Sequence, residues 1–123
     1  MYGYFVNDRL CAVQVINTVQ EDEYLQVGWT YTDNNPLVLH RLCVSPEYQN
    51  RGIARKMILF AENYAEENNY RTIRFDAFME NPISVNIYRK MGYNVAGTVR
   101  FRKGDFFCFE KRQFNLTRHK NII

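Results

Sequence analysis

The sequence has few of the features typical of secreted, membrane or nucleic-acid-binding proteins. Its three cysteines, an odd number without C-x-x-C spacing, indicate reduced thiols in a cytosolic protein. No apolar run is long enough to span a membrane, and no basic leader precedes the first strand-like segment. The net charge of +3 is too mild to indicate a nucleic-acid partner. We therefore predict a cytoplasmic protein that binds neither membranes nor nucleic acids and holds no metal.

Repeats and low-complexity segments are also absent. The 123 residues suffice for one domain, and a composition of 46% hydrophobic and 15% aromatic residues is enough for a packed core. We predict a single α/β domain over residues 1–114, followed by a polar tail over residues 115–123.

The expected strands and turns follow from apolar alternation and from turn residues between the alternating segments. Strands are expected over residues 2–6, 10–17, 24–31, 37–44, 72–78, 93–101 and 106–112. Turns are expected at residues 7–8, 33–36 and 103–105.

Two helices are expected, one over residues 52–69 and one between the N-cap Asn81 and the stop Gly92. The first helix has a predicted buried face and a predicted water face. The buried face comprises Ile53, Met57, Phe60, Ala61 and Tyr64, and the water face comprises Glu62, Glu66 and Glu67. Because this helix joins two strands, the strands at 37–44 and 72–78 are expected to pair in parallel.

The most informative segment is residues 49–55, which connects a strand to the first helix. A strand that turns through a glycine into a helix directs several free N–H groups and the positive end of the helix dipole at one point. Gly52 lets the backbone approach a ligand closely, and Arg51 and Arg55 add positive charge. The segment is therefore a candidate phosphate site.

The known phosphate motifs G-x-x-x-x-G-K-S/T and G-x-G-x-x-G are absent here. The motif Q-x-x-G-x-A at residues 49–54 instead resembles the pyrophosphate loop of the GNAT family of N-acetyltransferases, whose pattern is Q/R-x-x-G-x-G/A. Residues 81–93 resemble the family's second signature, N-x-x-A/S-x-x-L/I-Y-x-x-x-G-F/Y. With their connection, the two motifs cover residues 37–93, about half of the chain.

The resemblance implies a fold. GNAT proteins have a mixed, mostly antiparallel sheet whose two central parallel strands splay apart, with flanking helices. Members usually carry a strand and two helices before the segment that corresponds to residues 2–6, so we expect those N-terminal helices to be missing here. The helices normally cover one face of the sheet. We expect a homodimer to bury that apolar face instead.

The resemblance also implies a function, which is the transfer of an acetyl group from acetyl-CoA to a primary amine by direct attack in a ternary complex. The acceptor is a small molecule or the lysine or N-terminus of a protein. Cofactor contacts are implied for Leu42, Val44, Gln49, Asn50, Arg51, Gly52, Ile53, Ala54, Arg55, Asn81 and Tyr88. The alternative is a non-catalytic domain of the same fold that binds or senses acyl-CoA.

Three residues are candidates for catalysis. Tyr88 matches the family's general acid, although the same spacing also fits a core tyrosine. His40 and Asp76 are alternative general bases, and an imidazole needs less help from its surroundings to act near neutral pH, which favours His40. Structural roles compete, with His40 as a hydrogen-bonded core residue and Asp76 as the partner of Arg74 or Arg41 in a salt bridge.

An RNA-binding module is the rival from another class. Residues 103–109 weakly resemble the RNP1 pattern of RNA-recognition motifs. However, Asp105 occupies a position where that pattern needs an aromatic residue, and the order of elements does not fit the fold. We therefore prefer the acetyltransferase interpretation.

Overall fold

The structure is a computed structural model that describes residues 1–32 and 35–113. In this part of the chain, six strands form one sheet in the order β1-β2-β3-β4-β6-β5. The strands are β1 (Tyr2–Val6), β2 (Arg9–Asn17), β3 (Leu37–Val44), β4 (Thr72–Phe78), β5 (Asn94–Phe101) and β6 (Gly104–Arg112). The helices are α1 (Ile53–Glu67) and α2 (Pro82–Lys90), with short 3-10 turns η1 (Asp22–Gln26) and η2 (Pro46–Tyr48). The sequence-based bounds of these strands and of both α-helices are therefore confirmed to within two residues.

The sheet divides at its centre. The strands β3 and β4 are parallel but pair only at their beginnings, where Leu37 is opposite Ile73 and Val38 is opposite Arg74. Beyond Val38, β3 stays paired with β2, while β4 stays paired with β6 along its whole length. The inner edges of the two strands therefore separate, which confirms the predicted mixed sheet with a splayed parallel pair.

A β-bulge in β3 increases this separation. Val13 is opposite Cys43 and Val15 is opposite His40, so two residues of β3 face Gln14 alone. Arg41, one of these two, has a φ of 55°, in the left-handed region. A bulge bends its strand and resets the alternation of side chains. As a result, His40 and Leu42 point to opposite faces of the sheet although they are only two residues apart. Leu42 packs with the core on the helix side.

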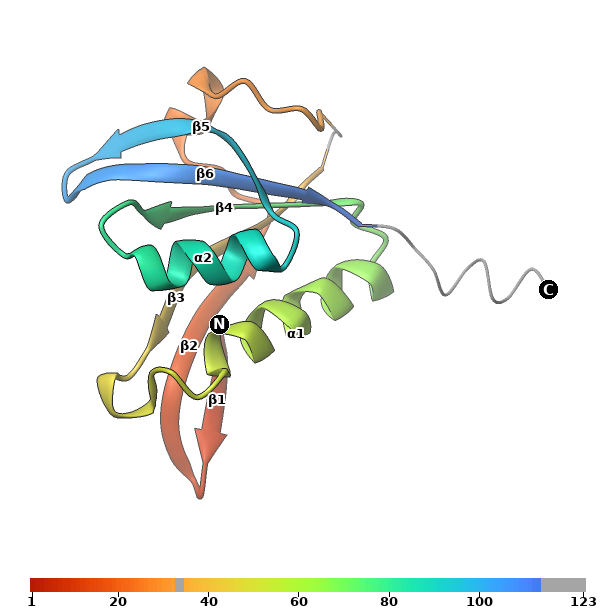
Figure 1. Cartoon of the computed structure of the whole chain (residues 1–123). Helices are drawn as coiled ribbons and strands as arrows, with labels where there is room; N and C mark the ends of the chain where they lie inside the picture. Colours follow the sequence, from red (N-terminus) through yellow and green to blue (C-terminus); the bar gives the residue numbers. More distant parts are fainter. Residues whose placement is uncertain (33–34, 114–123) are drawn as a thin grey trace.

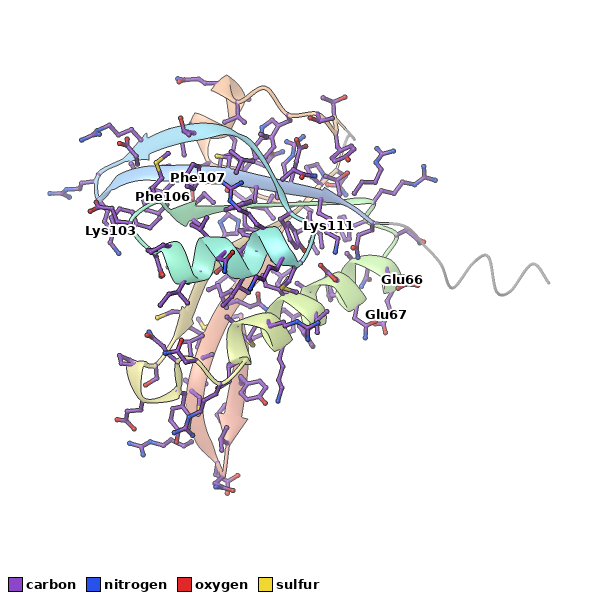
Figure 2. The ribbon with its side chains drawn as sticks, in the orientation of Figure 1. Glu66, Glu67, Lys103, Phe106, Phe107 and Lys111 are labelled. Carbon is purple, nitrogen blue, oxygen red and sulfur yellow. The ribbon has the colours of Figure 1, made fainter. Side chains whose placement is uncertain are left out.

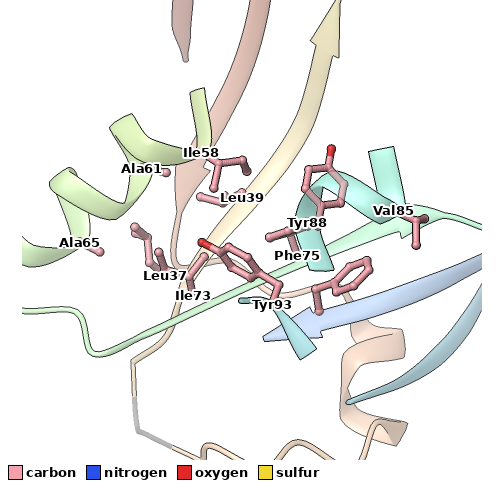
Figure 3. Packing of buried hydrophobic residues seen from close by; sticks show 12 residues of the cluster. Leu37, Leu39, Ile58, Ala61, Ala65, Ile73, Phe75, Val85, Tyr88 and Tyr93 are labelled. Atoms are coloured by element: carbon pink, nitrogen blue, oxygen red, sulfur yellow. The ribbon is translucent and has the colours of Figure 1, made fainter. Parts of the chain in front are cut away.

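Both α-helices cover the same face of the sheet (Figure 1). Between helices and sheet lies the largest cluster of buried side chains, in which Phe75 packs against the rings of Tyr88, Tyr93 and Phe109 (Figure 3). Burying large aromatic rings provides much of the driving force for folding at this face. We call it the helix face of the sheet.

Two predictions for α1 were wrong. Phe60 was expected to be buried but is 46% exposed, because the buried side of α1 includes Ile58 and Ala65 instead. The Phe60 ring packs on the ring of Tyr2 at the edge of the sheet, with 5.0 Å between the ring centroids. Glu62 does not face water. Its carboxylate accepts hydrogen bonds from the Tyr93 hydroxyl at 2.8 Å and from Lys111 Nζ at 3.1 Å, contacts that α1 periodicity does not reveal.

The opposite face of the sheet is covered by residues 20–31, which include η1. We call this segment the cover segment. The strand predicted over residues 24–31 was wrong, because the segment pairs with no strand of the described chain. Its backbone is held by side chains from the sheet instead. The buried Glu110 carboxylate accepts hydrogen bonds from the Thr30 N–H at 2.9 Å and the Tyr31 N–H at 3.0 Å.

Two other predictions concern residues 33–34 and 114–123. The turn at 33–36 falls partly, and the tail at 115–123 entirely, outside the described residues. The extent of the single domain stays a prediction. Within the described ranges, no helix has both the length and the apolar character needed to cross a membrane.

Candidate active site

A cavity of about 600 Å³ opens where β3 and β4 separate. Side chains from both faces of the sheet line it, because the split connects the two faces. The lining includes five residues that the sequence singled out for the site, namely His40, Leu42, Asp76, Asn81 and Tyr88. Val44 and residues 49–55 lie outside this lining, at the end of β3 and the start of α1.

Tyr88 stands on the helix side of the cavity. α2 brings its ring against Phe75 and Phe109, with centroids 4.8 and 5.7 Å apart, and leaves it 7% exposed. Burial raises the pKa of the phenol, and a hydrogen bond with Ser84 only partly opposes this effect. Tyr88 is therefore a core residue that also lines the cavity, and its role as general acid stays a prediction.

His40 lines the cavity from the other side. Its Nε2 lies 2.9 Å from Asn17 Oδ1, and this same oxygen accepts a hydrogen bond from the Val19 N–H. Nε2 is therefore the donor of the pair, and the neutral ring carries its lone pair on Nδ1. This arrangement fixes the ring and leaves one nitrogen able to accept a proton.

Asp76 lies on the same side as His40. Its carboxylate accepts a hydrogen bond of 2.7 Å from the hydroxyl of Tyr24, which is 2% exposed. Burial raises the pKa of Asp76, whereas the hydrogen bond from Tyr24 lowers it and the nearby charge of Glu21 raises it further. The cavity thus has a carboxylate that takes up a proton more readily than an exposed one.

The expected alternative partner of Asp76 was Arg74 or Arg41. Arg74 instead donates to Gln20 Oε1 at 2.8 Å and to the Tyr31 carbonyl, and its guanidinium lies 4.2 Å from the centroid of the Trp29 ring. The role of Tyr24 was missed, because the residue lies 52 positions from Asp76 within a segment read as a strand. No sequence signal would have revealed this contact.

The loop before α1 has the geometry of an anion site. Asn50 and Gly52 have φ values of 64° and 76°, and α1 begins directly after Gly52. The first backbone bond of the helix runs from Lys56 N to Gly52 O at 3.1 Å, so the N–H groups of residues 52–55 have no acceptor within the described chain. They are free to bind an anion.

The surroundings of this loop also fit a pyrophosphate. A Cβ placed on Gly52 would meet no atom within 4 Å, so the concave side is open. The Gln49 side chain donates to the Val44 carbonyl at 3.2 Å, which ties the loop to the end of β3. The Arg51 guanidinium lies 5.1 Å from the centroid of the Tyr48 ring, at the same end of the helix. Positive charge and free donors therefore occur together.

Asn81 is the helix cap that the sequence predicted, and its contact with the cofactor stays a prediction. Its Oδ1 accepts a hydrogen bond of 3.3 Å from Ser84 N and caps α2, and its side chain also lines the cavity. The cysteines are free, with Cys11 and Cys108 buried and Cys43 exposed. The described residues contain no group of three or more His, Cys, Asp and Glu side chains placed to hold a metal ion.

Solved structures with a similar fold are acetyltransferases. A GNAT-family acetyltransferase from Streptococcus agalactiae superimposes with a TM-score of 0.73 at 21% identity, over 89% of this chain and 62% of that one. An N-acetyltransferase from Staphylococcus aureus gives a TM-score of 0.70 at 16% identity, over 89% and 65%. The Bacillus subtilis N-acetyltransferase YlbP, in complex with coenzyme A, gives 0.61 at 28% identity, over 91% and 66%. The chain thus spans less than two thirds of the length of each of these three proteins.

The sequence comparison identifies the family. No curated protein matched the chain. The family profile described as the acetyltransferase (GNAT) family matches residues 3–93, which is more than half of the chain and includes both motifs, the splayed strands and α2. The fold, the cavity in the split sheet and this match agree, and the chain belongs to the GNAT family of acetyltransferases.

Proposed function

We propose that the protein transfers the acetyl group of acetyl-CoA to a primary amine by direct attack in a ternary complex. The observation that carries this proposal is the cavity in the split between β3 and β4, which Tyr88, His40 and Asp76 all line, while β3 leads on to the candidate anion loop at residues 49–55. Family membership supports the acetyl donor, and the donors around the loop supply the chemistry that its diphosphate needs.

Three parts of the chain would hold the cofactor. The free N–H groups at the start of α1, with Arg51 and Arg55, would bind its diphosphate. The inner edge of β3 from residue 39 to residue 44 has no strand partner on the side of β4, so its backbone is available to amides of an extended arm. Leu42 and Val44 belong to this edge. Asn81 lines the cavity beside it.

The residues around the cavity would move the protons of the reaction. The thioester supplies the acetyl group, and the amine must be neutral to attack it. His40 would take a proton from the amine through Nδ1, with Asp76 as the second candidate for this role. Tyr88, whose phenol is protonated at neutral pH and whose pKa burial raises further, would donate a proton to the departing sulfur.

A non-catalytic acyl-CoA-binding domain is the alternative. It would keep the loop and the split sheet but would show no turnover with any amine. The expectations of a homodimer and a cytoplasmic location stay predictions. Exposed apolar residues of the β1–β2 hairpin, Phe5 at 62% and Leu10 at 51%, are compatible with a homodimer.

The proposed cofactor site is tested by the substitution Gly52→Asp. A carboxylate at this position would lie among the N–H groups that bind the diphosphate, so like-charge repulsion is expected to weaken acetyl-CoA binding by roughly 100-fold or more. Isothermal titration calorimetry measures the affinity directly. Unchanged affinity would exclude the loop as the site.

Two control variants separate charge from other effects. Gly52→Asn adds a side chain of the same shape that also tolerates the left-handed φ of 76°, but without charge. It is expected to bind much more tightly than Gly52→Asp. Gly28→Asp adds the same charge at an open position of the cover segment and is expected to bind like the unmodified protein.

A further inference from the structure

Three phenylalanines form one end of the cavity, and neither the cofactor contacts nor the proton transfers use them. The rings of Phe78 and Phe101 each lie 5.2 Å from the ring of Phe106, measured between centroids. All three side chains are only partly buried and line the cavity, where β4 ends and the β5–β6 hairpin turns. We call these residues the aromatic wall. Such ring faces bind flat or apolar groups.

Carboxylates stand near the same part of the cavity. Glu21, at the start of η1, lines it together with Asp76, and the negative charge of Glu21 is close enough to raise the pKa of Asp76. The lining also includes two cations, Arg41 and Lys103, so the attraction depends on where a ligand lies in the cavity. A cationic group would be attracted here by charges at short range.

The two sides of the split differ in what lines them. On the helix side, Tyr88 and Ile58 from the two helices close the split, and both are buried. Both the aromatic wall and the carboxylates belong to the opposite face, as shown by the packing of Phe101 and Phe106 against Val99 and Cys108. An acceptor that reaches the split from this face meets both of them.

We propose that the acceptor is a monoamine with an aromatic or similarly flat apolar body, whose ring packs on the aromatic wall and whose ammonium is held by Glu21 and Asp76. This inference deepens the proposed acetyl transfer and rests on it. The ammonium group of the acceptor would then lie beside His40. The apolar body of the acceptor would fill the part of the cavity that is not lined by the edge of β3 and by Tyr88.

The cations around the cavity argue against acceptors with several positive charges. Lys103 Nζ lies 4.8 Å from the centroid of the Phe78 ring, at the far end of the aromatic wall (Figure 2), and Arg41 lines the cavity as well. A second ammonium on a longer acceptor would approach these like charges. A polyamine therefore fits less well than a compound with one amine.

Calorimetry with three amines tests the inference, using 2-phenylethylamine, n-butylamine and spermidine as probes, each with and without saturating coenzyme A. We expect 2-phenylethylamine to bind at least about tenfold more tightly than n-butylamine, as the burial of a ring predicts, and more tightly than spermidine. No binding of 2-phenylethylamine, no preference over n-butylamine, or a preference for spermidine would each overturn the inference. Acetyl-CoA binding, measured separately, shows whether the proposed function itself fails.

Matched variants locate the contact. Phe106→Ala should remove most of the preference for the ring, whereas Phe107→Ala should keep it, because the neighbouring Phe107 packs with the helix-side core and lies under Arg89 (Figure 2). Glu21→Gln should weaken all three amines about threefold to tenfold, and Glu67→Gln on the exposed end of α1 should not. Equal effects of Phe106→Ala and Phe107→Ala would contradict the proposed role of the aromatic wall. Because Glu21 is exposed, Glu21→Gln tests the proposed amine site without disturbing the fold.

Discussion

The two faces of the sheet are held in different ways. On the helix face, α1 and α2 pack through apolar and aromatic side chains such as Phe75 and Phe109, which are 4% and 0% exposed. On the other face, the cover segment packs through a smaller apolar cluster and is also held by charged side chains from the strands, with Glu110 accepting from two backbone N–H groups and Arg74 donating to Gln20 and Tyr31. The stability of an apolar face depends on the apolar surface area that is buried. The stability of the covered face also depends on a few individual hydrogen bonds.

The difference matters because the cavity connects both faces. The helix face contributes Tyr88, whose pKa is raised by burial, and the covered face contributes His40, Asp76 and the aromatic wall. The proposed proton donor and the proposed proton acceptors therefore lie on opposite sides of one sheet. Changes on the helix face should act on stability and on the leaving group, while changes on the covered face should act on the acceptor.

The largest expected effect tests how far the covered face depends on single residues. Glu110→Ala leaves the Thr30 and Tyr31 N–H groups without their buried acceptor, and we expect the free energy of unfolding to fall by about 3 kcal/mol. Urea denaturation followed by circular dichroism measures this change. Glu67→Ala, at an exposed position of α1, should stay within about 0.5 kcal/mol. A similarly small effect of Glu110→Ala would mean that the cover segment is held by its apolar contacts.

The same contrast explains what the sequence could predict. Periodicity predicted the bounds of the six strands of the sheet and of both helices, and the motifs placed Gly52 and Asn81 at the helix starts, although the face of α1 was wrong at Phe60 and Glu62. The cover segment has apolar residues such as Tyr24, Val27 and Trp29 that resemble a strand, yet carboxylates and guanidinium groups from distant strands decide its path. Contacts between residues 52 to 80 positions apart leave no local pattern.

The candidate site shows the same limit. The motifs identified the residues of the loop and Tyr88, but not the side of β3 that His40 occupies. Relative to Leu42, that side depends on the bulge at Arg41, a residue with a positive φ that no local rule for non-glycine residues anticipates. The pairing of Tyr24 with Asp76 was equally invisible, since it needs the path of the cover segment first.

A second prediction concerns the helix side of the cavity. Tyr88→Phe removes the proposed proton donor but keeps the ring packed on Phe75, so kcat should fall roughly 10²-fold while acetyl-CoA affinity stays nearly unchanged. Steady-state kinetics with thiol detection measure kcat. Tyr93→Phe is the matched control, because its hydroxyl binds Glu62 outside the cavity. Wild-type turnover of Tyr88→Phe would remove this residue from the mechanism.

A third prediction concerns the acceptor of the amine proton. His40→Ala should lower kcat/KM roughly tenfold or more near neutral pH and should abolish the acid limb of the pH profile. If that limb survives and shifts when the acceptor is replaced by an amine of different basicity, the amine loses its proton without His40. Asn17→Ala is a useful companion, because it frees the ring from its 2.9 Å contact while leaving the imidazole in place. We expect it to have a smaller effect than His40→Ala.

The smallest expected effect separates function from stability at Asp76. Burial raises the pKa of this carboxyl in the folded protein, so the folded state holds its proton more tightly than the unfolded state does. Its contribution to stability is therefore fully present below the unfolded pKa and is lost as the pH rises through the folded pKa. Asp76→Asn keeps an oxygen for the 2.7 Å hydrogen bond from Tyr24 but has no charge to bury. At neutral pH it should be at least as stable as the unmodified protein, although its turnover falls.

Thermal denaturation at neutral pH and at about pH 4, near the ordinary pKa of an aspartate, measures this difference. The stabilising effect of Asp76→Asn should shrink toward the lower pH, where the unmodified carboxyl is itself protonated. Asp105→Asn is the control, because that carboxylate is half exposed and bonded to Arg100 at 3.0 Å, so its loss should not stabilise the protein. A less stable Asp76→Asn at neutral pH would mean that the ionised carboxylate holds the cover segment in place. Asp76 would then be, like Glu110, a residue that stabilises the covered face. It would not be a residue whose burial at the cavity lowers the stability of the fold.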